Sequence, residues 1–244
     1  MRLSVELVPR DPASLAAQLE ELACLGRVDT VNVPDLAQFE LRGWQAALQA
    51  RAAGPWSAVP HFRAEPLLSE ADRGWPSLGR LLGAGVAEVL VVSGDAVDAD
   101  GRGAALAAIR ALKAARPELK VYAALDPYRA GFAAELAYAE AKLAAGADGL
   151  FTQPFFDLRL LSVWQELTAG AQVFWGVTSV TSPRSQRYWL RRNRAVFPAG
   201  FEPTLAWHRD LAARVLDHVA ASGGNLYFMP IKVGIGEWLG GLLD

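Results

Sequence analysis

Residues 142–157, KLAAGADGLFTQPFFD, join an alanine-rich helix to a buried strand. The helix ends at Gly146, because glycine readily adopts the left-handed conformation that stops a helix. The apolar strand that follows leads into Gln153, two aromatic residues and an acid. A buried amide without hydrogen-bond partners costs about 1 to 3 kcal/mol. We therefore expect a neighbour or a ligand to hydrogen-bond the Gln153 side chain.

The same alternation of helix and strand extends over the whole chain. Short apolar runs predict eight strands, at residues 3–8, 30–33, 58–63, 88–93, 121–126, 149–153, 172–177 and 225–229. Helical periodicity predicts helices at residues 15–26, 44–54, 77–85, 103–118, 133–146, 159–170, 185–196 and 204–223. Two helices are thus expected between the last two strands.

Eight such units in 244 residues predict an α/β fold, a (β/α)8 TIM barrel in a single domain over residues 1–244. The rival architecture, an open doubly wound sheet, usually carries G-x-G-x-x-G after its first strand, and this sequence has none there. In a barrel, ligands bind at the carboxyl ends of the strands. Six predicted strands carry polar residues inside them or at their ends, which we expect to converge on one site: Glu6, Asn32, His61, Asp95, Asp126 and Gln153.

Composition limits the classes of function. The chain is 52% hydrophobic and 20% charged, with a formal net charge of −2, which argues against a general nucleic-acid binder or a protein drawn to anionic membranes. One cysteine, Cys24, excludes an internal disulfide and is expected to pack on an apolar helical face. The N-terminus does not resemble a signal peptide, and no apolar run is long enough to span a bilayer. A cytoplasmic location is therefore expected.

Two polar residues are candidates for chemistry in the barrel. Glu6 interrupts the first strand, and if it points inward, loss of hydration would raise its pKa toward the range of a general acid. The alternative is an outward carboxylate at an exposed strand end. His61 either binds a ligand or is a core histidine bonded to backbone. His208 and His218 are expected on helix surfaces and have no neighbours at zinc-ligand spacing.

Charged residues on two helices also leave alternatives open. Glu135 and Lys142 share one helical face, either as a ligand site or as a solvated pair. The segment 183–194, PRSQRYWLRRNR, carries five arginines, which fit either an anion site or a solvated face. The exposed aromatics expected at Trp189, Trp207 and Trp238 would suit a homo-oligomeric interface.

Several motifs resemble those of the methylenetetrahydrofolate reductase family. AGAD followed by TQPFFD is similar to a family signature, and other pieces lie in family order: SVELVP, DTVNVPD, VPHFRA, LVVSGD and GVTSVTSPRSQRYW. The resemblance implies a cytoplasmic TIM-barrel oxidoreductase of one-carbon metabolism and methionine biosynthesis. Such an enzyme reduces 5,10-methylenetetrahydrofolate to 5-methyltetrahydrofolate, with NAD(P)H as electron donor and FAD as the flavin.

The resemblance also implies roles for individual residues. Catalysis would fall to Glu6 as proton donor, Asp95 beside the flavin and Gln153 on the pterin. The cofactor would be held by His61, Gly94, Asp95, Asp126, Glu135 and Lys142. Gln153, Phe155 and Trp189 would contact the folate.

Some positions depart from the family pattern, mainly where flavin would bind. Pro34 replaces a threonine, Ser93 replaces an arginine, and Asp126 stands in place of a tyrosine. These departures leave two alternatives to the flavoprotein: a flavin-independent reductase of a related one-carbon carrier, or a non-catalytic folate- or pterin-binding partner subunit.

Overall fold

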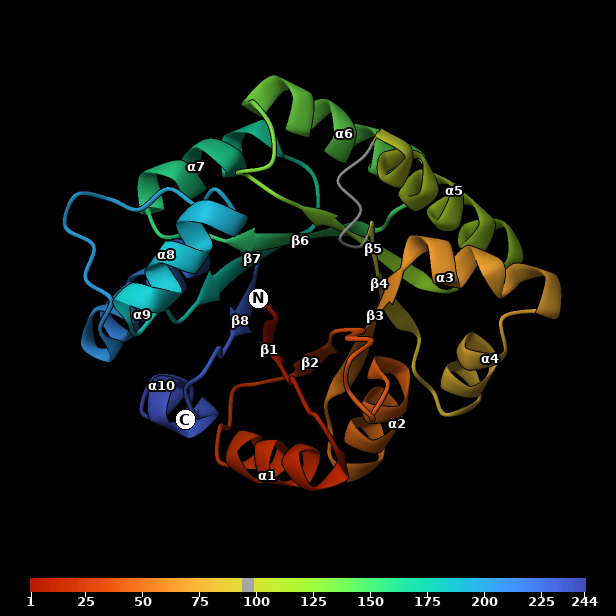
Figure 1. Cartoon of the computed structure of the whole chain (residues 1–244), viewed down its shortest axis with the longest axis horizontal. Helices are drawn as coiled ribbons and strands as arrows, with labels where there is room; N and C mark the ends of the chain where they lie inside the picture. The colour runs from red at the N-terminus through yellow and green to blue at the C-terminus, as the bar shows by residue number, and fades with distance from the viewer. Residues whose placement is uncertain (94–98) are drawn as a thin grey trace.

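Eight parallel strands form the centre of the molecule. The computed structural model describes residues 1–93 and 99–244, with no side chain described at 99–102. Within these ranges the strands close into a barrel in sequence order, and neighbouring strands run parallel (Figure 1). The strands are β1 (Leu3–Glu6), β2 (Thr30–Val33), β3 (Ser57–Arg63), β4 (Glu88–Val92), β5 (Lys120–Leu125), β6 (Gly149–Pro154), β7 (Val173–Thr178) and β8 (Asn225–Met229). The predicted α/β TIM barrel is confirmed.

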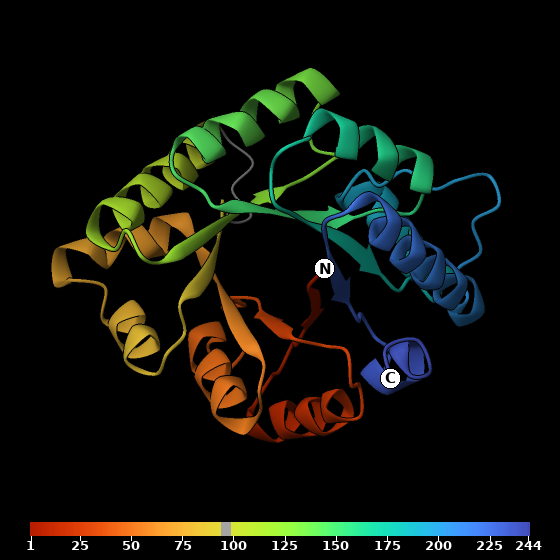
Figure 2. The same ribbon diagram turned by 180° about the vertical axis from the view of Figure 1, so that it is seen from behind.

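Helices surround the barrel, as Figures 1 and 2 show from opposite sides. They are α1 (Pro12–Ala23), α2 (Gly43–Ala53), α3 (Ala64–Ser69), α4 (Pro76–Gly83), α5 (Ala99–Ala115), α6 (Phe132–Ala144), α7 (Leu158–Leu167), α8 (Pro183–Arg192), α9 (Leu205–Ser222) and α10 (Ile235–Leu239), with a 3-10 turn η1 (Ala71–Arg73). The two helices predicted between the last strands are α8 and α9. Helix α3 was not predicted from the sequence, because six residues are too few to show a helical period.

Strand alternation divides the apolar side chains into two cores. Residues such as Val5, Val31 and Val121 point outward and pack beneath the helices. The opposite faces of the strands fill the barrel with a separate, largely aromatic cluster: Val59, Leu90, Tyr122, Phe151, Phe174, Tyr227 and Met229. Within it, the rings of Phe151 and Phe174 are stacked with centroids 4.0 Å apart. The barrel interior is therefore packed at mid-height and leaves room for a ligand only toward its ends.

A charged network closes the amino-terminal end of the barrel. The Arg2 guanidinium donates to Glu88 Oε2 at 2.8 Å and to Thr30 Oγ1 at 2.9 Å. Its central carbon lies 5.3 Å from the centroid of the Phe174 ring. The Tyr122 hydroxyl donates to the same Glu88 oxygen at 3.0 Å. The polar side chains at this end therefore hydrogen-bond one another.

The backbones of β6 and β7 approach closely at Gly176. A Cβ atom there would lie 2.5 Å from the Thr152 carbonyl oxygen, so no larger residue fits without displacing backbone. The Gly176 amide also donates to Thr152 Oγ1 at 2.7 Å. The pairing of the two strands shifts register between Phe151 and Pro154, next to this contact. This irregularity ends β6 at the segment that carries Gln153.

Several exposure predictions are wrong. Trp238 and His208 are fully buried and Trp189 is buried, because α8, α9 and α10 pack back onto the barrel. Cys24 is exposed instead of packed, since it follows the last residue of α1. Among the described residues, no helix is both long and apolar enough to cross a membrane.

We predict that Arg2→Gln lowers the free energy of unfolding by about 1 to 3 kcal/mol, because it leaves the mostly buried Glu88 carboxylate without its cation. Urea denaturation measures the change. Arg116→Gln is the control, because among the described residues the side chain of this exposed arginine bonds only the carbonyl of Ala115. Equal stability of the two variants would contradict a structural role for the Arg2 network.

Candidate functional site

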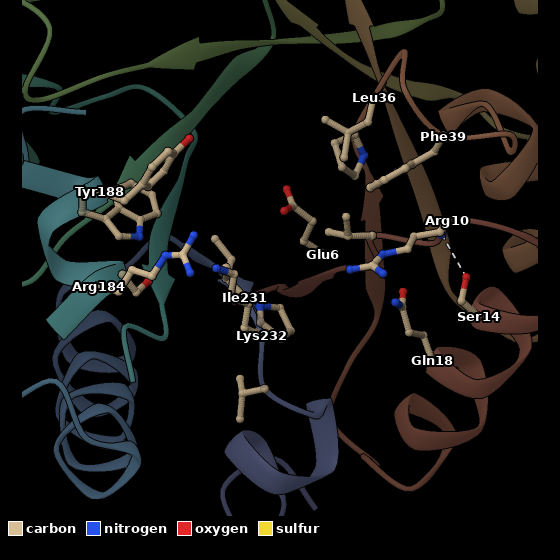
Figure 3. A pocket seen from close by; sticks show the side chains of 16 residues that line it. Glu6, Arg10, Ser14, Gln18, Leu36, Phe39, Arg184, Tyr188, Ile231 and Lys232 are labelled. Carbon is tan, nitrogen blue, oxygen red and sulfur yellow. Dashed lines mark hydrogen bonds between the residues drawn. The ribbon is translucent and has the colours of Figure 1, made fainter. Parts of the chain in front are cut away.

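A cavity of about 870 Å³ opens at the carboxyl end of the barrel, where barrel enzymes bind ligands (Figure 3). Its walls come from the end of β1, from the segments after β1, β2 and β8, and from α1 and α8. The lining residues are Glu6, Val8, Arg10, Ser14, Gln18, Pro34, Leu36, Phe39, Arg184, Ser185, Tyr188, Trp189, Pro230, Ile231, Lys232 and Val233. The volume is that of a site for a small organic molecule.

Glu6 is the acid in this lining. It is the last residue of β1, and its carboxylate accepts a short hydrogen bond from the Tyr227 hydroxyl of β8. Burial in the barrel raises the pKa of Glu6 to about 7, although the Tyr227 hydrogen bond acts in the opposite direction. The prediction of an inward Glu6 is confirmed in its geometry. A carboxyl group that titrates near neutrality can both accept and donate a proton at physiological pH.

Three cations line the same cavity. Arg10 follows β1, Arg184 lies in the first turn of α8, and Lys232 follows β8. None of the three forms an ion pair with an acid in the described part of the chain. Figure 3 shows the Glu6 carboxyl between Arg184 on one side and Arg10 on the other. Three cations facing one carboxyl group that is partly protonated at neutral pH favour an anionic ligand.

Lys232 occupies an unusual backbone conformation. Its φ is +58°, in the left-handed region that side chains other than glycine rarely adopt. The preceding residue, Ile231, is bonded to Ser179, the residue after β7, because its amide donates to Ser179 Oγ and its carbonyl accepts from the same hydroxyl, both at 3.1 Å. These bonds fix the loop that places Lys232 at the cavity. Strain of this kind is typical of functional sites.

Gln18 of α1 brings an unused acceptor to the cavity. Its Oε1 atom is buried and has no hydrogen-bond partner within the described residues. The side chain points toward the centre of the cavity beside Arg10 (Figure 3). A buried acceptor without a donor costs about 1 to 3 kcal/mol, so a ligand donor at this place would be stabilising.

His61 lies in the barrel interior as part of a hydrogen-bond chain. Its Nε2 atom is 3.1 Å from Asn32 Nδ2, and Asn32 Oδ1 accepts a short bond from Ser4 Oγ. The alternative of a core histidine bonded to backbone is therefore wrong, since its partner is the Asn32 side chain. Burial lowers the pKa of His61 to about 3, so the ring is neutral at pH 7.

Other predicted site residues are distributed differently. Gln153 is half-buried at the end of β6, and its side chain makes no hydrogen bond to any described residue, so the expected neighbour is not found and a ligand contact stays a prediction. Phe155 is fully buried against Trp175 in the outer core, away from the cavity. Trp189 does line the cavity. Gly94 and Asp95 lie outside the described residues.

The residues expected to hold a cofactor are bonded to the protein itself. Glu135 is fully buried, forms an ion pair with Arg129, and accepts from the Asp126 amide at 3.1 Å. Lys142 donates to the Ala124 carbonyl, and its ammonium lies 3.7 Å from the centroid of the Tyr138 ring. Burial raises the pKa of Asp126. The solvated-pair reading of Glu135 and Lys142 is wrong, since both support the loop between β5 and α6 and the end of β5.

The described residues contain no group of three or more His, Cys, Asp or Glu side chains that could hold a metal ion.

Four residues of the site were not predicted from the sequence. Arg10 and Lys232 follow the carboxyl ends of β1 and β8, so the barrel rule could have indicated them. Tyr227 has the inward register of its strand, but no pattern in the sequence links it to Glu6, 221 residues away. Gln18 is a polar residue in a predicted helix, and no sequence pattern distinguishes it from residues on the helix surface.

We predict that Glu6 lowers stability as the pH rises. Because the folded state binds a proton at Glu6 more tightly than the unfolded state, the free energy of unfolding falls between the unfolded pKa of about 4.5 and the folded value of about 7, by roughly 3 kcal/mol in all. The difference in unfolding free energy between wild type and Glu6→Gln, measured from pH 4 to 8, isolates this slope. His61 and His208, whose lowered pKa values give the opposite slope, cancel in the difference. A difference that does not change with pH would contradict the buried carboxyl.

Comparison with known proteins finds similarity in structure alone. No family model matches the chain, and no curated relative matches it. Among solved structures, 2,3-dimethylmalate lyase, a PEP mutase/isocitrate lyase superfamily member, matches with a TM-score of 0.59 at 13% identity, over 96% of this chain and 75% of the other. Phosphoenolpyruvate phosphomutase from Streptomyces platensis subsp. rosaceus matches with a TM-score of 0.53 at 17% identity, over 93% and 76%. Oxaloacetate acetylhydrolase in complex with the inhibitor 3,3-difluorooxalacetate matches with a TM-score of 0.59 at 11% identity, over 94% of this chain and 74% of the other.

These similarities correct the sequence-based assignment. The similar structures are lyases, a mutase and a hydrolase, so the prediction of a methylenetetrahydrofolate reductase, an NAD(P)H oxidoreductase with FAD, is wrong. The two alternatives, a flavin-independent reductase and a folate-binding partner subunit, do not fit these structures either. The internal bonds of Glu135 and Lys142 give a physical reason, because those side chains are already used within the protein. At these identities the chain is similar in fold to members of the PEP mutase/isocitrate lyase superfamily.

Proposed function

We propose that the protein is an enzyme with lyase or mutase chemistry on a small organic anion. The observation that carries the proposal is the meeting of Glu6, which titrates near neutrality, with three cations that have no acidic partner in the described structure. Glu6 moves the proton, and Arg10, Arg184 and Lys232 bind the anionic groups of the substrate. A cytoplasmic location remains part of this proposal.

The number of cations supports a substrate with at least two anionic groups. Arg10 and Arg184 approach the Glu6 carboxyl from opposite sides of the cavity (Figure 3). Arginine binds carboxylate and phosphate oxygens through paired N–H donors, so each guanidinium suits one such group. Lys232 adds a third positive charge at the cavity rim.

The names of the similar structures support the same class of substrate. They refer to 2,3-dimethylmalate, oxaloacetate and phosphoenolpyruvate, which are all small carboxylic acids with a further acidic group. Gln18 Oε1, the buried acceptor without a donor, supports a substrate that also carries a hydroxyl group.

Cleavage of a 2-hydroxy dicarboxylate illustrates how Glu6 would act. The ionised Glu6 accepts the proton of the substrate hydroxyl, whose oxygen then forms a carbonyl with C2. The C2–C3 bond breaks, and its electron pair stays on C3 as an enolate stabilised by the neighbouring carboxylate. Protonated Glu6 returns the proton to C3, which yields a 2-oxo acid and a second carboxylic acid and restores the enzyme. The cations offset the charge that moves toward the substrate oxygens.

We predict that the protein converts at least one of 2,3-dimethylmalate, oxaloacetate and phosphoenolpyruvate. Proton and phosphorus NMR of the reaction mixture measures the conversion. Glu6→Gln should lower kcat by about 100-fold or more, because the amide can neither accept nor return the proton. In wild type, kcat should rise with pH toward about 7 as Glu6 ionises. Glu20→Gln, an exposed position on α1, is the control. A cavity that neither converts nor binds any of the three anions would contradict the proposal.

A second prediction concerns the cations. Arg184→Gln should raise KM by roughly 10- to 100-fold, since it removes a charge-assisted contact to the substrate. Arg187→Gln is a matched control, because Arg187 lies on the same helix but does not line the cavity. Steady-state kinetics of both variants test this. If the two substitutions raised KM equally, the effect would come from the overall positive charge of α8, and a direct contact between Arg184 and the substrate would be contradicted.

A further inference from the structure

We propose that His61 is a substrate-contacting residue of this site, and that Ser4 and Asn32 fix its neutral ring with the proton on Nδ1, from which it donates to a carbonyl or alkoxide oxygen of the substrate. The inference rests on the proposed function, because it assigns the group that faces the reacting oxygen. It gives Asn32 a positioning role and leaves proton transfer to Glu6.

The direction of the hydrogen bonds fixes the proton of the ring. Ser4 Oγ donates to Asn32 Oδ1, which leaves the Asn32 amide nitrogen to face His61 Nε2 at 3.1 Å. An amide nitrogen only donates, so Nε2 must accept and carries no proton. The neutral ring therefore has its proton on Nδ1. Ser4 and Asn32 are both fully buried, so water does not compete for this chain.

The free edge of the ring faces the barrel mouth. His61 Nδ1 has no partner among the described residues and is not among the fully enclosed atoms that lack one. The amino-terminal end of the barrel is closed by the Arg2 network, and the aromatic cluster fills the middle. With the other end closed and the middle filled, we infer that the Nδ1 edge of His61 faces the carboxyl end of the barrel. His61 is not among the residues that line the cavity described above, so a substrate must reach deeper than that lining to contact it.

His61 is adjacent to the proton-transfer pair. Its ring meets the Tyr227 ring edge-on, with centroids 6.4 Å apart, and the Tyr227 hydroxyl bonds Glu6. The strand register pairs Glu6, Asn32 and Val59 across β1, β2 and β3, and His61 is the next inward residue of β3 after Val59 in the direction of the carboxyl end.

A neutral imidazole donor suits this place chemically. Its N–H stabilises an oxygen on which negative charge develops, and it does so without adding a second titrating group near Glu6. Burial holds the pKa of His61 far below neutrality, so the ring stays a neutral donor through the working pH range. The preorganised N–H donor is expected to stabilise the transition state, because it points at the substrate oxygen on which negative charge changes.

The test uses 15N-histidine-labelled protein and long-range proton–nitrogen NMR at pH 7, with His61→Gln to assign the signal. We expect a pyrrole-type Nδ1 and a pyridine-type Nε2 for His61. The opposite pattern, with the proton on Nε2, would overturn the proposal, because Asn32 would then be accepting from the ring. This measurement uses folded wild-type protein and does not depend on turnover.

The second arm adds 3,3-difluorooxalacetate to the same sample. The His61 Nδ1 proton should shift on binding, and Asn32→Asp should weaken binding at least 10-fold by calorimetry, because its carboxylate draws the ring proton to Nε2. Asn225→Asp makes the same exchange at the Arg2 end of the barrel and should change binding by less than 2-fold. Binding without a shift at His61 would overturn this inference and leave the proposed function standing. Absence of binding would overturn both.

Discussion

The closed barrel imposes one constraint on every inward polar side chain: it must find a partner inside the barrel or a ligand at the mouth. Because a carboxyl, amide or imidazole group loses its water there, each unpaired group is costly. The chain meets this constraint in two ways. At the amino-terminal end, Arg2 and Glu88 bond each other. At the carboxyl end, burial raises the pKa of Glu6 to about 7, because the hydrogen bond from its partner, the Tyr227 hydroxyl, lowers the pKa only in part.

The distribution of charge follows from that difference. Arg2 at the closed end is paired with Asp29 and Glu88, whereas the three cations that line the cavity, Arg10, Arg184 and Lys232, form no ion pair with a described acid. The aromatic layer between the two ends separates them. A site with excess positive charge and one partly protonated carboxyl group therefore lies at the mouth, where three separate loops, α1 and α8 meet.

The fold was predictable from the sequence, because strand and helix periodicities repeat along the chain and the glycine ends are regular. The inward position of Glu6 was predictable for the same reason, since Glu6 lies between the outward-facing Val5 and Leu7 at the end of β1. Contacts between distant residues were not predictable. Nothing in the sequence links Glu6 to Tyr227, or shows that Lys142 turns onto the Ala124 carbonyl. Motifs read at strand ends suggested a reductase, yet similar strand ends arise in any barrel that places polar groups at its mouth.

The central claim is that Glu6 titrates near neutrality within an anion-binding site. A carbon-13 NMR titration of glutamate-labelled protein, with Glu6→Gln for assignment, measures this directly. The account predicts a Glu6 Cδ signal that titrates near pH 7 and moves to a different midpoint when 3,3-difluorooxalacetate is added, because the bound anion changes the field at the carboxyl. A Glu6 signal that titrates below pH 5 and does not respond to the anion would contradict it.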